Sequence, residues 1–281
     1  MFPVMEVVVE HQAARVALQS PVRARRVCKI CAGPGIVVLH QIRGTAYYYC
    51  ASCDFLQNFH LEDQRGAGAT PQEENDEARA RLWSAGDQAA MQTKGWEILG
   101  LMSSPLAWTS RSVHAALKKI PAYDQWYKDR ARKKFRRLLD FGCGHGVIVF
   151  ELRKKGFDCT GLDPFSPVLD PHIYRTPLLE MRFPEEAYDG IFSIETMEHI
   201  PNVIETYQEL HRILRPGGML LVQTRRLEDP DYQNEREQWF YLQEPATHVS
   251  VYSETSMRRI AAKTGFRSVR FRGVKFARFE K

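Results

Sequence analysis

Two pairs of cysteines carry the most specific chemistry in the sequence. Cys28 and Cys31 form one C-x-x-C pair, and Cys50 and Cys53 form a second. Each pair can lie on a tight turn that directs two thiolates at one ion, and two such turns complete a tetrahedron. The spacing therefore predicts a zinc site, structural rather than catalytic because all four protein ligands are cysteine. The alternatives are four unligated buried cysteines or a redox pair, although no βαβ pattern surrounds the pairs.

A second set of residues can hold a small molecule against the backbone. Gly142, Gly144 and Gly146 alternate with other residues directly after Asp140, and apolar residues precede and follow them. The pattern predicts a buried parallel strand, a tight glycine turn and the first turn of a helix, where the backbone adopts unusual dihedrals and a ligand can approach closely. A second short strand ends at Asp163, about where a ribose-binding carboxylate is expected.

These two segments and two later ones resemble the class I S-adenosylmethionine-dependent methyltransferases. Asp163 stands where that superfamily has the acid that closes its second strand, and the segment Glu198–Asn202 follows the fourth strand as in ubiquinone-type O-methyltransferases. The matching segments, in the superfamily's order, are Asp140–Gly146, Asp163, Tyr188–Glu195 and Leu214–Val222.

The resemblance implies a cofactor and a set of residues that bind it. The cofactor is S-adenosylmethionine, with its methionine part against the glycine turn and its ribose hydroxyls donating to the Asp163 carboxylate. Glu195, at the carboxyl end of the fourth strand, is expected to face the ligand crevice. We assign to the cofactor site Asp140, Gly142, Cys143, Gly144, Gly146, Asp163, Pro164 and Glu195. Cys143 and Cys159 are also expected to act as small packing residues.

Two histidines are candidates for the acceptor side. A hydroxyl acceptor must lose a proton near the moment of attack, and histidine is the usual base. His199 closely follows the fourth strand, and His248 lies in an aromatic insertion where a cap over the acceptor is expected. For each, the alternative is a structural histidine. The absence of an Asn-Pro-Pro-Tyr-like segment after the fourth strand argues against methylation of adenine in DNA, and the absence of a Pro-Cys pair argues against cytosine C5 chemistry.

The expected fold is α/β, a Rossmann-like seven-stranded methyltransferase sheet with a small amino-terminal zinc-ribbon module. The predicted division is residues 1–65 for the ribbon, 66–122 for a linker and helical segment, and 123–281 for the methyltransferase domain. A ribbon of this size has too small an apolar core to fold alone, so metal binding is expected to supply its folding energy while the methyltransferase core survives chelation.

Several local elements can be placed from spacing and capping residues. We predict ribbon strands over 36–39 and 46–49, a helix over 203–214, and a helix over 254–264 that begins at Ser253 and ends at Gly265. A final antiparallel strand pair is expected around Gly273, and the segment 123–137 resembles the helix that covers the cofactor pocket in the superfamily.

One stretch departs from the superfamily's pattern. A proline-rich piece over 164–171 stands where a full helix is usual, and the third strand is expected to be short, near Ile173–Arg175. Leu178 and Leu179 are then expected as pocket walls.

Composition and charge set the cellular context. No apolar run is long enough to span a bilayer, and no secretory signal is recognisable, so the cytoplasm is the expected location. The net charge is +5, and basic residues cluster near 23–29, 128–137 and 267–278. Such clusters are either solvated faces or a binding surface for a phosphate-rich acceptor such as RNA or a nucleotide-linked sugar.

Three functions remain after these observations. The first is methyl transfer to a small-molecule or sugar-linked acceptor, with the ribbon docking or shaping the acceptor, because the chain resembles ribbon-bearing methyltransferases that act on sugars. The second is methylation of ribosomal or transfer RNA, since some rRNA guanine methyltransferases also begin with a four-ligand zinc module. The third is a catalytically silent binding module. The acceptor atom and the oligomeric state stay open.

Overall fold

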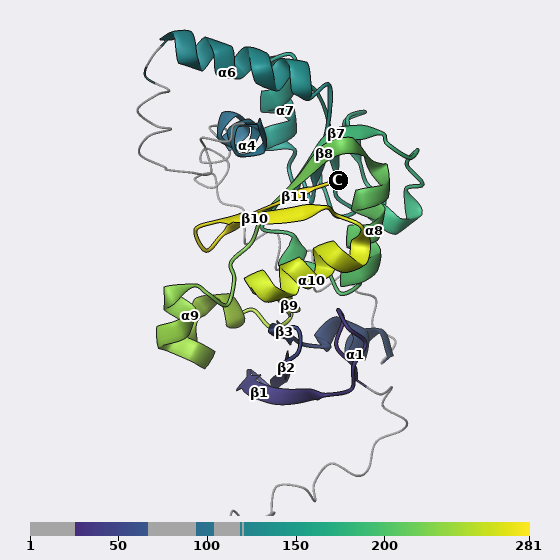
Figure 1. Cartoon of the computed structure of the whole chain (residues 1–281). Coiled ribbons are helices and arrows are strands. Elements are labelled where there is room, and N and C mark those ends of the chain that lie inside the picture. The colour runs from purple at the N-terminus through teal and green to yellow at the C-terminus, as the bar shows by residue number, and fades with distance from the viewer. Residues whose placement is uncertain (1–25, 67–93, 104–118, 120) are drawn as a thin grey trace, which may run out of the picture.

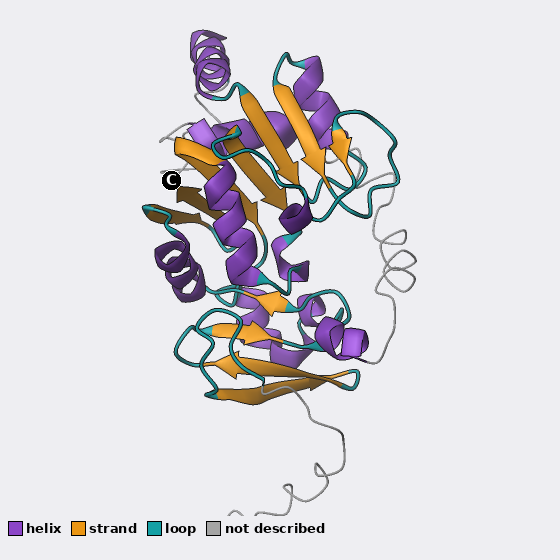
Figure 2. Ribbon diagram, turned by 90° about the vertical axis from the view of Figure 1, so that its right-hand side faces the viewer, coloured by secondary structure: helices purple, strands orange, loops and turns teal. Residues whose placement is uncertain are grey.

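The computed structural model describes residues 26–66, 94–103, 119 and 121–281. Most of the linker and helical segment predicted for 66–122 lies outside these residues. The described chain forms two sheets, a large one and a small one. The small sheet lies beyond the carboxyl ends of the parallel strands of the large sheet (Figure 1; Figure 2).

The large sheet confirms the predicted methyltransferase architecture. Its order is β10-β11-β8-β7-β4-β5-β6, and β11 runs antiparallel to both neighbours while β8, β7, β4, β5 and β6 pair in parallel. The strands are β4 (Arg137–Phe141), β5 (Asp158–Leu162), β6 (Ile173–Tyr174), β7 (Tyr188–Ile194), β8 (Leu214–Gln223), β10 (Ser268–Arg272) and β11 (Phe276–Glu280). The short third strand and the final antiparallel pair lie where the sequence predicts them.

Apolar residues on both faces of these strands explain why helices cover the sheet on two sides. Leu138 and Leu139 are neighbours on β4, and Ile191 and Phe192 are neighbours on β7, yet each pair divides between two separate core clusters. Successive side chains of a strand point to opposite faces. One face packs against α4 (Lys94–Ser103), α6 (Pro121–Lys134) and α7 (Val147–Lys154), and the other against α8 (Val203–Ile213) and α10 (Glu254–Thr264).

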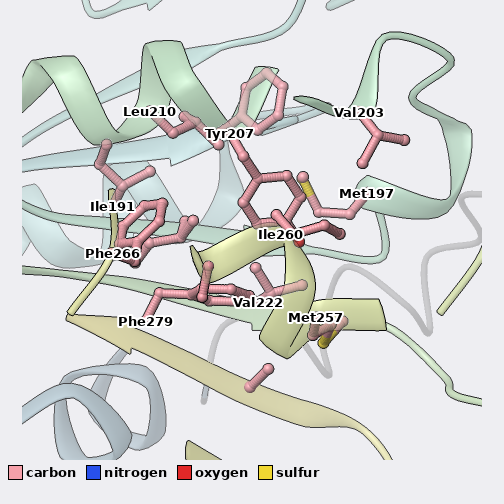
Figure 3. Close-up of a cluster of buried hydrophobic side chains, with 14 of the residues drawn as sticks. Ile191, Met197, Val203, Tyr207, Leu210, Val222, Met257, Ile260, Phe266 and Phe279 are labelled. Carbon is pink, nitrogen blue, oxygen red and sulfur yellow. The ribbon is translucent and has the colours of Figure 1, made fainter. Parts of the chain in front are cut away.

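Figure 3 shows the second of these cores, in which α8 and α10 pack over the sheet. Tyr207 and Phe279 are fully buried there, with ring centroids 5.2 Å apart. Because interiors are close-packed, this core fixes α8, and with it the loop that joins β7 to α8. The labelled side chains are Ile191, Met197, Val203, Tyr207, Leu210, Val222, Met257, Ile260, Phe266 and Phe279.

Capping residues set the helix ends, as the sequence predicts. The Ser253 side chain accepts from the backbone of Ser256, the Ser256 hydroxyl accepts from the backbone of Ser253, and α10 ends at Gly265 with φ 89°. A left-handed residue at a helix end favours glycine. The helix expected over 203–214 ends one residue earlier, because Leu214 already pairs with Tyr188 as the first residue of β8.

Helix α6 differs from expectation. The segment 123–137 resembles a helix that covers the cofactor pocket, but α6 packs on α4 and leads into the amino end of β4, at the opposite end of the sheet (Figure 1). The end of α6 is held there because Phe135, which follows it, is buried in the core that β4 shares with α4, α6 and α7. None of its described residues lines the cavity described below.

The small sheet has the order β1-β2-β3-β9. The hairpin of β1 (Ile36–Ile42) and β2 (Thr45–Cys50) turns on Arg43 and Gly44, both with positive φ, as two-residue hairpin loops require. It is followed by β3 (Phe55–Gln57) and α1 (His60–Gly66). Its fourth strand, β9 (Ser250–Val251), comes from the distant insertion after β8.

The insertion packs on the ribbon around a buried tryptophan. Trp239 is fully buried and contacts both Tyr232 and Tyr241, and the same cluster contains Tyr47 and Leu56 of the ribbon. The insertion also contains α9 (Pro230–Glu235) and the short turns η4 (Arg236–Gln238) and η5 (Phe240–Leu242). The boundary at residue 65 stays a prediction, but residues 1–65 do not build the small sheet alone.

Candidate functional site

The four cysteines of the two C-x-x-C pairs converge. Their sulfur atoms all lie within 4.8 Å of one another, and Sγ of Cys31 and Sγ of Cys50 are 3.8 Å apart. Thiolates about 2.3 Å from a tetrahedral zinc ion would lie about 3.8 Å from one another. Burial raises the pKa of Cys28 to about 11 and that of Cys53 further. The donor set and its spacing fit one tetrahedral ion.

The glycine turn and Asp163 form one connected structure at the carboxyl ends of β4 and β5. Gly142, Gly144 and Gly146 all have positive φ, and the N–H of Gly144 donates to Oδ2 of Asp163 at 2.9 Å. Oδ1 of Asp163 accepts from the backbone N–H of Phe165, also at 2.9 Å. Asp163 therefore positions the turn, and each of its oxygens keeps further capacity to accept hydrogen bonds.

A cavity of about 480 Å³ opens beside this turn. Three of the residues assigned to the cofactor line it, namely Gly142, Asp163 and Pro164, and Leu178 and Leu179 line it as expected. Its volume is in the range of small-molecule sites. The other assigned residues are absent from the lining: Asp140, Cys143, Gly144, Gly146 and Glu195.

Two of these residues, Asp140 and Cys143, do not line the cavity because their side chains are buried beneath its lining. Asp140 is almost fully buried, and burial together with the nearby Asp163 raises its pKa well above the usual range. Cys143 packs against Gly161 of β5 so closely that any side chain at Gly161 would meet its sulfur. Cys143 and Cys159 both belong to the apolar core between the sheet and α7.

The rest of the cavity lining comes from other parts of the chain. His199 and Thr196 follow β7, Leu61 belongs to α1 of the ribbon, and Ala246 and Thr247 belong to the insertion. Sequence reasoning missed Leu61 and Ala246, because only the pairing of β3 with β9 brings them to the sheet and no local motif marks them. The cavity is thus shared by the large sheet, the ribbon and the insertion.

The two predicted histidines lie side by side, with ring centroids 4.9 Å apart. Nδ1 of His199 lies 2.9 Å from the carbonyl of Thr247, and Nδ1 of His248 lies 2.5 Å from that of Tyr241. A carbonyl can only accept, so in each neutral ring Nδ1 carries the hydrogen and Nε2 is the unprotonated nitrogen. Burial, and then His199, lowers the pKa of His248 to about 4, which makes it neutral at physiological pH.

Two glutamates accompany the histidines. Burial, and then Glu198, raises the pKa of Glu195 to about 7, and burial also raises the pKa of Glu198. Glu198 is 1% exposed, and its Oε2 has no hydrogen-bond partner among the described residues. Potential ligand atoms of Glu198, His199 and His248 all lie within 4.8 Å of one another. Sequence reasoning named both histidines but gave Glu198 no role, although it directly precedes His199.

The ribbon holds the segment that carries His248. The Asn58 side chain donates to the carbonyls of Pro245 and His248 at 3.0 and 3.1 Å, and its backbone N–H donates to Val249. The Tyr47 hydroxyl also donates to the carbonyl of His248, at 2.8 Å. Asn58 is fully buried. Ribbon side chains therefore help to position His248, together with the carbonyls of Tyr241 and Glu244 in its own insertion.

Comparison with known proteins identifies the family. The family model described as "Methyltransferase domain" matches residues 111–270, more than half of the chain, and this span contains the glycine turn and both histidines but not the four cysteines. The chain belongs to this methyltransferase family. The prediction of a class I S-adenosylmethionine-dependent methyltransferase is thereby confirmed.

Several curated methyltransferases are similar to part of the chain. The mitochondrial ubiquinone biosynthesis O-methyltransferase of Rattus norvegicus is 34% identical over 104 residues, 31% of this chain and 30% of the relative. The corresponding enzyme of Bradyrhizobium is 27% identical over 141 residues, 42% of this chain and 56% of the relative. The putative methyltransferase YqeM of Bacillus subtilis is 31% identical over 127 residues, 39% of this chain and 51% of the relative. The chain thus matches between about a third and about half of these relatives' lengths.

Solved structures show a similar partial match. A SAM-dependent methyltransferase from Archaeoglobus fulgidus is 20% identical with a TM-score of 0.41, over 56% of this chain and 76% of that chain.

Among the described residues of the present chain, no helix combines the length and the apolarity that crossing a bilayer requires.

The glycine turn gives a testable contrast. Gly142 and Gly156 have φ of 80° and 84°, but a Cβ at Gly142 would collide with the Thr196 side chain, whereas a Cβ at Gly156 has nothing within 4 Å. Gly156→Ala should therefore cost only the left-handed strain, about 1–2 kcal/mol of unfolding free energy. Gly142→Ala should cost about 1–3 kcal/mol more through overpacking. Urea unfolding followed by circular dichroism measures both, and equal losses would refute the packing of Thr196 against the turn.

Proposed function

We propose that this methyltransferase transfers a methyl group from S-adenosylmethionine to a hydroxyl of a small-molecule or sugar-linked acceptor. The observation that carries the proposal is the shared cavity, whose lining contains Gly142 and Asp163 together with His199. One cavity can thus take a cofactor on the glycine side and an acceptor on the histidine side. The names of the ubiquinone O-methyltransferase relatives support a hydroxyl acceptor.

The cofactor side follows the superfamily's pattern. We place the methionine part against the backbone of the glycine turn and the ribose at Asp163, whose oxygens each accept one backbone N–H and can accept more. Asp140, Cys143, Gly144, Gly146 and Glu195 then shape the site from behind. Pro164 lines the cavity beside the ribose position.

The reaction is an in-line displacement. The acceptor oxygen forms a bond to the methyl carbon, the carbon–sulfur bond breaks, and its electron pair stays on sulfur as S-adenosylhomocysteine forms. The hydroxyl proton must leave near that moment, and we propose His199 and His248 as the residues that act on it. Holding both molecules in line in a closed cavity can supply roughly 7–11 kcal/mol of the rate enhancement.

We propose one structural zinc ion at Cys28, Cys31, Cys50 and Cys53. Its role is indirect, because the sheet it anchors presents Tyr47 and Asn58 to the His248 segment. Zinc there would fix the acceptor wall without touching the acceptor. None of the six cysteines, all of which the structure describes, forms a disulfide, which supports the cytoplasm as the proposed location.

Three of the basic residues are bound within the protein, which weakens the case for RNA. Lys29 pairs with Glu62 and donates to the carbonyl of Asn58, and Arg26 pairs with Asp63. Arg278 is buried and donates to the carbonyl of Leu101. A side chain that is paired within the protein is less available to neutralise a phosphate, so these three residues are weak candidates for binding RNA. RNA methylation and a catalytically silent module stay as outcomes of the test below.

The cofactor assignment predicts the effect of Asp163→Ala. The substitution removes charge-assisted hydrogen bonds worth about 1.5–3 kcal/mol each, so affinity for S-adenosylmethionine should fall about 10–100-fold or more. Calorimetry measures the affinity, with Asp158→Ala, at an exposed position, as the matched control.

Labelled-methyl transfer into a fractionated cell extract then identifies the acceptor class. Label in RNA, or no transfer despite cofactor binding, would contradict the proposed function, and unchanged affinity in Asp163→Ala would contradict the ribose assignment.

The zinc proposal predicts a wider effect than loss of the ribbon alone. Because β3 pairs with β9, Cys53→Ser should expose both the ribbon and residues 245–251 to limited proteolysis and should lower methyl transfer, while affinity for S-adenosylmethionine changes little. Cys159→Ser makes the same atomic change outside the cluster and should keep the metal. Elemental analysis of freshly reduced protein should find one zinc per chain. A content well below that would refute the site.

A further inference from the structure

The cluster of Glu198, His199 and His248 has the properties of a second metal site. Two imidazoles and a carboxylate have their ligand atoms within 4.8 Å of one another. Glu195 contacts Glu198 and offers a second carboxylate at the same place. His199 of this group lines the same cavity as Gly142 and Asp163.

Both histidines are oriented as metal ligands usually are. Each directs Nδ1–H at a backbone carbonyl, of Thr247 for His199 and of Tyr241 for His248, which makes Nε2 the unprotonated nitrogen. Histidines that bind metals almost always donate their other ring hydrogen to a carbonyl or a carboxylate. Such a bond fixes both the tautomer and the plane of the ring.

An independent observation favours a cation at this place. Oε2 of Glu198 is buried and has no hydrogen-bond partner among the described residues, on a side chain that is 1% exposed. Burying a carboxylate oxygen without a donor is costly, and buried charges are normally paired or bind metals. The Glu198 carboxyl also has hydrogen bonds with Tyr241, Thr224 and Glu195, so Oε2 is its one atom without a partner among the described residues.

We propose that Glu198, His199 and His248, with Glu195 beside them, bind one divalent cation of the first transition row at the acceptor end of the cavity. Mixed imidazole and carboxylate ligands suit Mn²⁺, Fe²⁺, Co²⁺ and Zn²⁺, and three protein ligands leave positions open for an acceptor oxygen. This site is distinct from the four-cysteine cluster, whose soft thiolates select zinc.

The role of the cation in catalysis rests on the proposed function; its binding does not. A bound cation lowers the pKa of a hydroxyl that coordinates it. The acceptor oxygen then releases its proton to solvent, forms the bond to the methyl carbon and leaves the carbon–sulfur electron pair on sulfur. In this arrangement the two histidines assist deprotonation as ligands rather than by accepting the proton themselves.

The direct test is titration with Mn²⁺ of the full chain loaded with only one equivalent of zinc, which the four thiolates bind first, followed by electron paramagnetic resonance without any acceptor. Zinc in the four-cysteine cluster keeps that site from competing. The expected result is one Mn²⁺ per chain, with ¹⁴N coupling in pulsed spectra from imidazole ligands. No Mn²⁺ binding, or binding without nitrogen coupling, would overturn the proposal, and neither result depends on a variant that must fold.

Variants then assign the ligands. Glu198→Gln and His248→Gln should each weaken Mn²⁺ binding at least about 10–100-fold, while Glu205→Gln and His211→Gln on α8 make the same changes outside the cluster. Calorimetry with S-adenosylmethionine shows that the variants are folded. Mn²⁺ binding without methyl transfer to any acceptor would contradict the proposed function alone, whereas metal-independent transfer with no Mn²⁺ binding would contradict only this inference.

Discussion

The pairing of β3 with β9 is the contact on which the site depends. It joins only Leu56 to Val251 and Gln57 to Ser250, yet these residues lie almost two hundred positions apart in the chain. The pairing adds a strand of the methyltransferase insertion to the ribbon sheet and places Thr247 and His248 over the carboxyl end of β7. The pairing thereby brings Leu61 of the ribbon and Ala246 and Thr247 of the insertion to the cavity.

Such a short pairing cannot be stable by itself, so buried side chains must hold it. Trp239 and Tyr47 supply apolar burial, and the Asn58 side chain donates hydrogen bonds to the carbonyls of Pro245 and His248. A buried polar group that loses its partner costs about 1–3 kcal/mol, so this contact tolerates little displacement. The zinc ion that we propose at the four cysteines would fix the turns that carry β2 and β3. The ribbon contributes Leu61 to the cavity lining and is therefore better described as part of the cavity than as an appended domain.

The sequence predicts the parts of this structure that local chemistry determines. The glycine turn, the short third strand and the limits of α10 follow from residues that need particular backbone dihedrals or caps, and each lies where predicted. The cysteine spacing likewise brings four thiols together. Contacts between distant segments could not be predicted: β9 has two residues and no periodicity, Leu61 has no motif, and the position of α6 depends on where Phe135 is buried. His199 and His248 were found as single residues, but their adjacency, and that of Glu198, depends on the β3–β9 pairing.

The central claim is that the ribbon builds the acceptor wall, and Asn58→Ala tests it most directly. This substitution removes the donors to Pro245 and His248 without touching the cavity lining, the cysteines or the cofactor wall. Steady-state methyl transfer should fall about 10-fold to 100-fold, as expected for a small misplacement of a catalytic group, while calorimetric affinity for S-adenosylmethionine stays unchanged. Gln41→Ala, on the exposed side of the same sheet, should alter neither quantity. Full methyl transfer by Asn58→Ala would contradict the account, and so would an equal loss of cofactor affinity.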